Sequence, residues 1–210
     1  TTKVATNVQT EICDWNDWLV ELNLPQSEIN GLNGTELKIT SMTYDHSLVR
    51  NPLDMAFPAN FDGDDDVTFK GFWLKQAKVI LPEGLSTYED PTQRVEVQLN
   101  NWIINKSSGI TGQALAANII NLPKANIADL GASIDTLQIS FLNSTAENAY
   151  IKGKIILPFS DSTSSNALLY TGLFGGEDTS GIKGFKFTLE PEGNIKARLF
   201  AGSSMEIYPS

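Results

Sequence analysis

Apolar and polar residues alternate along several short stretches of the chain. Val95–Leu99 and Phe185–Leu189 both place an apolar residue at every second position. Successive side chains of a strand point to opposite faces, so this pattern predicts strands with one apolar and one solvated face. No window of helical length carries a clean apolar spacing of three to four residues. Gln113–Asn118 is rich in helix-forming residues, but it lies between Gly112 and β-branched residues, and we predict a strand there.

A hairpin is predicted near the end of the chain. Residues Glu190–Asn194 contain Pro and Gly, which favour turns, and Ile195–Leu199 alternates again. We therefore predict that Phe185–Leu189 and Ile195–Leu199 pair as a β-hairpin. The Ser/Thr-rich segment Ser160–Ser165 is interpreted as a connection within the fold, because six polar residues are too few for a tether between domains.

Three short blocks of sequence occur twice in the same order. Asn23–Pro25 recurs as Asn121–Pro123, Thr35–Met42 resembles Asp135–Leu142, and Lys78–Pro82 resembles Lys154–Pro158. Similar blocks in a fixed order are typical of an internal duplication. In the pair of blocks Thr35–Met42 and Asp135–Leu142, the apolar residues Leu37, Ile39, Leu137 and Ile139 should face the core. Lys38 and Gln138, which stand between them, should face solvent. The sequence therefore predicts an all-β protein, either an antiparallel β-sandwich or an elongated β module, built from two copies of a strand-turn-strand unit.

The two copies suggest how the chain is organised. We place the first β unit at residues 1–107 and the second at residues 108–210, and we expect them to pack as one continuous module. The first unit contains a long inserted loop, residues 43–67, where the second has only Asn143–Ala149. Because loops often carry function on a scaffold, this loop is the first place to look for a specific site. The chain starts within a unit and stops at a strand boundary, as a fragment of a longer repetitive protein would.

Charge and composition exclude some classes of partner and cofactor. The 210 residues include 25 acidic and 15 basic side chains, which gives a net charge of -10. Binding of a phosphate backbone needs Lys or Arg, so we expect no nucleic-acid partner. No segment approaches the roughly 18 consecutive apolar residues of a transmembrane helix. Cys13 is the only cysteine, which excludes an internal disulfide and a Cys-based metal site.

An acidic run in the long loop makes calcium the one cofactor to consider. The candidate ligands are Asp62, Asp64, Asp65 and Asp66. Hard cations bind several carboxylate oxygens on a flexible loop. However, Trp73 stands at the twelfth position counted from Asp62, where a helix-loop-helix calcium loop has glutamate. A looser calcium site and a solvated acidic turn both remain open, and no other cofactor is indicated.

Aromatic residues supply the candidate ligand-binding group. Trp15 and Trp18 flank two polar residues and could form a platform on which a sugar ring stacks; the alternative is one core Trp and one edge Trp. Tyr44 and His46, at the start of the long loop, are further candidates. His46 is the only histidine, which excludes a His-rich metal site. Its acidic and hydroxyl neighbours do not make a catalytic triad, because a triad requires side chains that converge in space.

These observations favour a protein without enzymatic activity. No phosphate-binding loop or nucleophile elbow occurs in the sequence. We therefore predict a structural or interaction module from a larger repetitive β protein, whose partners are neighbouring domains or subunits. Its expected location is extracellular, on a cell surface or in an assembled particle. The alternative is a β-sandwich that binds a glycan or another ligand, with or without the help of calcium. A lipid-binding β-groove and a hydrolase are more remote alternatives.

Overall fold

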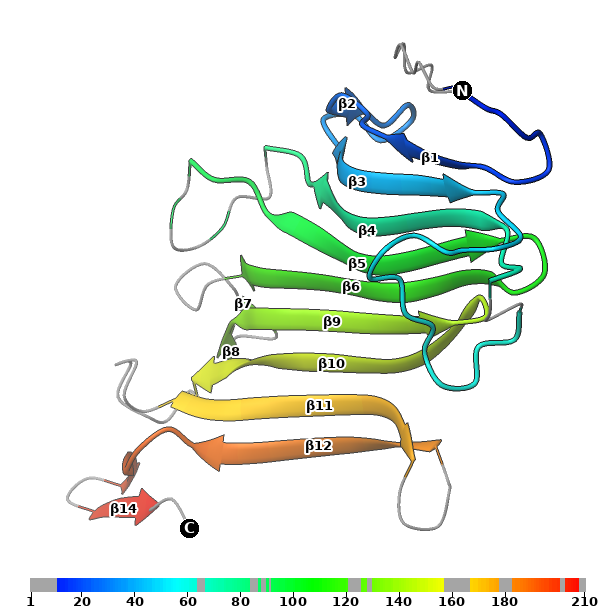
Figure 1. Cartoon of the computed structure of the whole chain (residues 1–210). Coiled ribbons are helices and arrows are strands. Elements are labelled where there is room, and N and C mark those ends of the chain that lie inside the picture. The colour runs from blue at the N-terminus through cyan, green and yellow to red at the C-terminus, as the bar shows by residue number, and fades with distance from the viewer. Residues whose placement is uncertain are drawn as a thin grey trace. The chain divides into compact units, whose positions relative to one another are not determined.

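The computed structural model describes residues 11–63, 67–83, 87, 90, 92–120, 126–127, 130–156, 167–177, 183–200 and 203–207. Within these residues the protein is all-β, with fourteen strands and no helix (Figure 1). The strands are β1 (Leu19–Leu22), β2 (Ser27–Glu28), β3 (Glu36–Asp45), β4 (Gly71–Ile80), β5 (Glu96–Asn105), β6 (Gly109–Ile120), β7 (Asn126–Ile127), β8 (Leu130–Ala132), β9 (Ile134–Leu142), β10 (Thr145–Ile156), β11 (Ala167–Glu177), β12 (Lys183–Pro191), β13 (Ile195–Phe200) and β14 (Ser203–Ile207).

Most of the strands belong to one antiparallel, open sheet. Its hydrogen-bonded order is β1-β3-β4-β5-β6-β9-β10-β11-β12, and the short strands β2, β7 and β8 pair beside it. The all-β prediction is confirmed, and so is the strand predicted at Gln113–Asn118, which lies within β6. The sandwich stays a prediction. The described residues contain no helix that is long and apolar enough to span a membrane.

The predicted hairpin near the C-terminus is wrong, although both of its strands exist. β12 pairs with β11, and β13 pairs with β14 in a separate two-stranded sheet. The apolar side of β12 finds an apolar side on β11, where Phe185 lies opposite Phe174. Strand register follows the matching of such faces. The other edge of β12 has no partner strand among the described residues, so the turn residues that follow Pro191 do not close a hairpin with β13.

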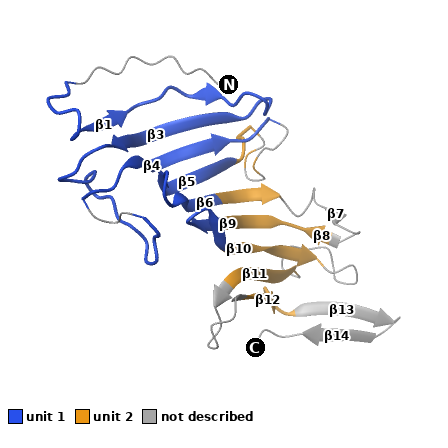
Figure 2. Ribbon diagram, turned by 90° about the vertical axis from the view of Figure 1, so that its right-hand side faces the viewer, with its two compact units in different colours: residues 1–84, 96–115, 139–147 blue, residues 85–95, 116–138, 148–210 orange. Residues whose placement is uncertain are grey.

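The chain divides into two compact units, coloured separately in Figure 2. Unit 1 comprises residues 1–84, 96–115 and 139–147, and unit 2 comprises residues 85–95, 116–138 and 148–210. Strands β6, β9 and β10 each contribute residues to both units. Each unit is therefore described by itself below.

One face of β3, β4 and β5 carries the first apolar cluster of unit 1. Its buried members are Met42, Leu74 and Ala77, and Leu22, Leu24, Ile39, Leu99, Trp102 and Ile104 pack against them. Ile39 and Met42 are three residues apart, so strict alternation would place them on opposite faces. The register between β3 and β4 shifts after Ile39, and this bulge returns Met42 to the same face. Lys38 is exposed, as predicted, whereas Gln138 is half-buried in β9.

The opposite face of β4 and β5 carries a second cluster, here named the covered cluster. It consists of Phe61, Phe69, Trp73 and Ile103, with Met55 and Phe57 packed against it. The loop of residues 46–70 between β3 and β4 folds back to supply the phenylalanines (Figure 1). Gly71 lets the start of β4 lie close to β5 and to the Phe69 ring, because a Cβ there would lie 2.4 Å from the Ile104 carbonyl oxygen and 2.8 Å from Cζ of Phe69. Phe61 and Phe69 of this loop are thus part of the core of unit 1.

Candidate functional site

Three of the predicted ligand-binding residues come together in unit 1. The ring centroid of Trp18 lies 5.1 Å from that of Tyr44 and 5.4 Å from that of His46. Phe72 joins them, with its ring centroid 4.7 Å from that of Tyr44, and its side chain is 38% exposed. These four residues are named the Trp18 cluster. Half-exposed rings of this kind can stack on the apolar face of a ligand while polar ring atoms donate or accept hydrogen bonds.

Sheet register produces the Trp18 cluster. Tyr44 on β3 lies directly opposite Phe72 on β4, and the backbone N–H of His46 donates to the carbonyl of Trp18 over 2.9 Å. Phe72 was missed by the sequence analysis. Its only signal is its place in the apolar run that begins at Gly71.

Trp15 contributes its backbone to this region. Its carbonyl accepts a hydrogen bond from the indole N–H of Trp18 over 3.1 Å, while its own side chain is 76% exposed. The stacking platform made of both tryptophans therefore stays a prediction, and the ring partners that the structure gives Trp18 are Tyr44 and His46.

Two carboxylates lie beside the Trp18 cluster, at the start of the long loop. Asp45 and Ser47 are fully buried, and the N–H of Ser47 donates to Oδ1 of Asp45 over 2.8 Å. The Ser47 hydroxyl donates to Oδ1 of Asp17 over 2.5 Å, and this bond is the main reason why the pKa of Asp17 is lowered. Oδ2 of Asp45 has no hydrogen-bond partner among the described residues. Burial, reinforced by the nearby charge of Asp17, raises the pKa of Asp45 to about 6.

The predicted calcium ligands are only partly placed. Asp62 is exposed, and its backbone N–H donates to Oδ1 of Asn143 over 3.0 Å. Asp64, Asp65 and Asp66 lie outside the described residues. In the part of the chain that the structure describes, no three His, Cys, Asp or Glu side chains are grouped so that they could hold a metal ion. The calcium site stays a prediction.

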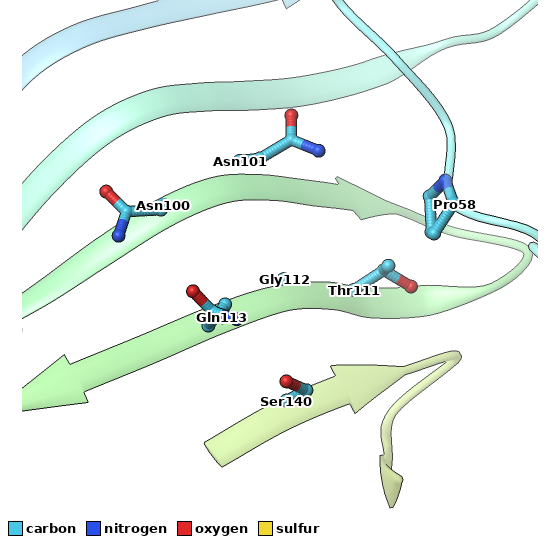
Figure 3. A pocket seen from close by; sticks show the side chains of 7 residues that line it. All are labelled: Pro58, Asn100, Asn101, Thr111, Gly112, Gln113 and Ser140. Carbon is cyan, nitrogen blue, oxygen red and sulfur yellow. The ribbon is translucent and has the colours of Figure 1, made fainter. Parts of the chain in front are cut away.

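A cavity of about 310 Å³ lies in unit 1 beside the long loop (Figure 3). It is lined by Pro58, Asn100, Asn101, Thr111, Gly112, Gln113 and Ser140. Asn101 is fixed in place, since its Oδ1 accepts the indole N–H of Trp73 over 2.7 Å and its Nδ2 donates to the Ala56 carbonyl over 3.2 Å. The surface that these residues expose to the cavity is mostly apolar, so their side-chain types alone do not indicate a ligand. The Asn100-Asn101 doublet was its only signal in the sequence.

A row of exposed apolar side chains lies on β11 and β12 in unit 2. This aromatic row consists of Phe174, Phe185, Phe187 and Leu189, which are 46%, 59%, 47% and 49% exposed. The ring centroids of Phe174 and Phe185 are 4.7 Å apart, and those of Phe185 and Phe187 are 6.0 Å apart. The alternation of Phe185–Leu189 predicted a strand with one apolar face. That face is largely exposed in the described residues.

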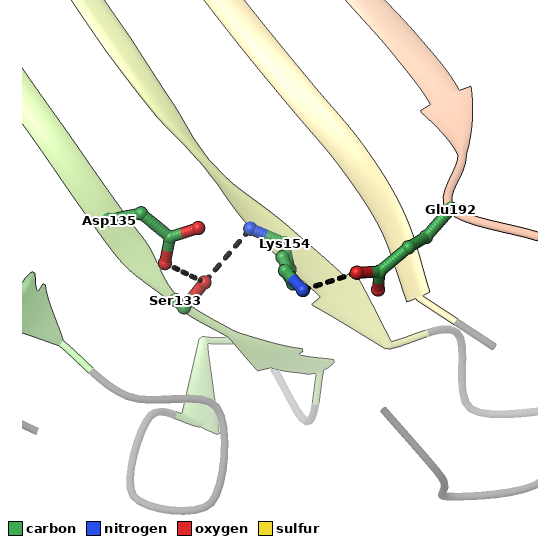
Figure 4. Close-up of polar contacts among 4 residues, drawn as sticks. All are labelled: Ser133, Asp135, Lys154 and Glu192. Atoms are coloured by element: carbon green, nitrogen blue, oxygen red, sulfur yellow. Dashed lines mark hydrogen bonds and ion pairs between the residues drawn. The ribbon is translucent and has the colours of Figure 1, made fainter. Parts of the chain in front are cut away.

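A polar network fixes the end of β12 in unit 2 (Figure 4). The Ser133 hydroxyl donates to Oδ1 of Asp135 over 2.8 Å and accepts the backbone N–H of Lys154 over 2.9 Å. The Lys154 ammonium group pairs with Glu192, directly after β12, over 2.5 Å. The Tyr170 hydroxyl donates to the Ser133 carbonyl over 2.7 Å, and burial raises the pKa of Tyr170. The network joins β10 to the end of β12 and has a structural role.

Comparison of the chain with protein-family models, curated proteins and solved structures finds no match. The geometry of the aromatic row and of the Trp18 cluster is therefore the basis for a proposed function.

Proposed function

We propose that the chain is a non-enzymatic structural or interaction module of a larger β protein, secreted, on a cell surface or in an assembled particle. The observation that carries this proposal is the aromatic row. The Phe185 ring lies next to the rings of both Phe174 and Phe187, and each of the three side chains is at least 46% exposed, so they form an apolar surface that water solvates poorly. Contiguous exposed apolar surface of this kind marks sites of association between proteins. The partners would be neighbouring domains or subunits.

The strand arrangement supports the same proposal. The second matched blocks, Thr35–Met42 and Asp135–Leu142, form most of β3 and β9, and the third matched blocks begin in the last residues of β4 and β10. In both copies, therefore, two strands that follow each other along the chain are neighbours in the sheet. We interpret this as a duplicated strand pair, the kind of unit from which repetitive β proteins are built. The first matched proline pair cannot be compared, because Pro123 lies outside the described residues.

Hydrogen exchange tests the proposal. Amide exchange along β11 and β12 should be slower in the assembly in which the protein occurs than in the dilute, isolated chain, because association covers these strands. Exchange along β4 serves as the control and should be the same in both states. Unchanged exchange of β11 and β12, with protection at another surface, would show that the aromatic row is not the interface.

The Trp18 cluster supports a second function, the binding of a glycan. Its rings are partly exposed and adjacent, as a sugar-stacking surface requires. Titration with oligosaccharides of several linkage types, followed by tryptophan fluorescence, should then show saturable binding. Trp18→Ala should abolish this binding, and Phe187→Ala in unit 2 is the control. A calcium-assisted site should lose affinity in chelator, and binding that survives Trp18→Ala would contradict this site.

A further inference from the structure

One backbone edge of β12 has no partner strand among the described residues. β12 ends the strand order of the sheet and pairs on one side with β11. The N–H of Glu192 donates to the Ala167 carbonyl over 3.0 Å, so the backbone groups of every second residue from Glu192 backwards point at β11. The register has no shift between Phe185 and Pro191. The backbone groups of Phe187 and Leu189 therefore point away from β11, towards the open edge.

The residues at this edge are self-complementary in charge. The central sequence of β12 reads Lys186-Phe187-Thr188-Leu189-Glu190. If a second copy runs antiparallel with a two-fold axis through Thr188, each Lys186 lies opposite Glu190 of the other copy. Opposite charges in directly paired positions stabilise an antiparallel pair, and like charges destabilise it. Both charged side chains are exposed and lie on the face opposite the aromatic row.

We propose that β12 pairs edge to edge with β12 of a second copy, centred on Thr188. The proposal rests on the interaction function and names its partner. In this register Phe187 and Leu189 of the other copy form a hydrogen-bonded pair, since the backbone groups of both point to the edge. The aromatic rows of the two copies then become one continuous apolar surface.

The same residues disfavour a foreign strand at this edge. Lysine in an edge strand opposes pairing with an unrelated strand unless an acidic residue meets it. Pro191 lacks an N–H at a position that points outward, so it ends the ladder after Phe185 has paired with it. A second copy of β12 places the acidic Glu190 opposite Lys186. In the proposed register it also needs no hydrogen bond from Pro191. This makes a two-fold pair the favoured occupant.

Disulfide trapping tests the register. In a background in which Cys13 is replaced by Ser, Thr188→Cys should form a covalent dimer on mild oxidation. The two Thr188 residues would form a non-hydrogen-bonded pair, with a Cα separation of about 4.5 Å that suits a disulfide. Thr171→Cys is the matched control, because Thr171 lies opposite Thr188 on β11, one strand in from the edge. Equal yields from the two variants would overturn the proposed register.

Charge exchange tests the partner. Lys186→Glu and Glu190→Lys should each weaken the dimer by about tenfold in sedimentation equilibrium, because each places like charges together at two symmetric positions. The double variant should recover most of this affinity. Lys152→Glu is the control, since Lys152 lies on the same face but on β10. A double variant as weak as the single ones would overturn the proposal.

Different results would contradict the interaction function of the aromatic row and the identity of its partner as a second copy. If the isolated chain stays monomeric and Thr188→Cys does not cross-link, the second copy is not the partner. Protection of β11 and β12 in the assembly would then still support an interaction module with another partner. If the chain does not dimerise and β11 and β12 are also not protected from exchange in the assembly, the interaction function of the aromatic row is rejected as well.

Discussion

The covered cluster of unit 1 and the aromatic row of unit 2 are built from the same kind of residue with opposite outcomes. In the covered cluster Trp73 on β4 and Ile103 on β5 form an apolar strand face, and in the aromatic row Phe174 on β11 and Phe185 on β12 do the same. In the covered cluster Phe69 is 0% exposed and Trp73 is 4% exposed, whereas Phe185 in the aromatic row is 59% exposed. The difference is the loop of residues 46–70, which packs Phe61 and Phe69 onto the sheet. No described segment does the same for the aromatic row.

The comparison shows that an apolar strand face acquires its role from what covers it. A covered face contributes to stability through the apolar area that it removes from water. An uncovered face contributes little to the stability of the chain and is available for association. The following predictions test how the loop is held over its strands and how little the aromatic row matters for folding.

Phe69→Ala should have the largest effect on stability. Removal of a fully buried phenylalanine lowers the free energy of unfolding by about 3–5 kcal/mol. Phe185→Ala in the aromatic row should lower it by less than about 1 kcal/mol, because most of that side chain is already in water. Urea denaturation of both variants makes the measurement. Equal losses would mean that the aromatic row belongs to a core after all.

Asn101→Gly should have the next largest effect. The side chain joins Trp73 to the Ala56 carbonyl in the loop, and loss of both hydrogen bonds should cost about 1–3 kcal/mol. Asn118→Gly is a matched control, because Asn101 and Asn118 are both strand residues with positive φ, 49° and 53°. A loss at Asn101 no greater than at Asn118 would show that the amide does not hold the loop.

Asp45 should make the stability of unit 1 depend on pH. Its folded pKa of about 6 lies above the ordinary value of 3.8, so the folded state binds the proton more tightly. The resulting stabilisation is complete below about pH 3.8 and is lost as the pH rises through 6. Relative to Asp45→Asn, the wild type should therefore lose about 1–3 kcal/mol between pH 4 and pH 7. If the difference in melting temperature between the wild type and Asp45→Asn is the same from pH 4 to pH 7, the carboxyl group of Asp45 is not buried as described.

The contribution of Asp17 runs in the opposite direction. Its pKa is lowered, mainly by the Ser47 hydroxyl, so its stabilisation is present above the ordinary pKa and lost as the pH falls. Both proteins in the Asp45 experiment contain Asp17, so the difference between them reports Asp45. Ser47→Ala, which removes the hydroxyl, should weaken the low-pH dependence that Asp17 causes.

Lys75→Ala should have the smallest effect. Its ammonium group pairs with Asp54 of the loop over 3.0 Å, but both side chains are more than half exposed. Such exposed pairs contribute about 0–1 kcal/mol. A larger loss, persisting in high salt, would point to the contact between Lys75 and the Trp73 ring rather than to the ion pair.

The strands themselves were determined by the sequence. The alternation of Phe185–Leu189 placed its phenylalanines on one face of β12, and the β-branched context of Gln113–Asn118 placed it in β6. These are local properties, because side-chain direction along a strand repeats every two residues wherever the strand lies. The net charge and the exclusion of an internal disulfide by the single cysteine likewise follow from the sequence alone.

Only the tertiary structure decided which strands meet and which faces are covered. β12 pairs with β11 on one edge, and its other edge does not pair with β13 although a turn-forming sequence joins the two strands. Strand register brings Phe72 against Tyr44, which in turn contacts Trp18. Phe61 and Phe69 joined the core because the loop of residues 46–70 packs them against Trp73. These contacts join residues far apart in sequence, and their energy appears only when the chain has closed the intervening loops.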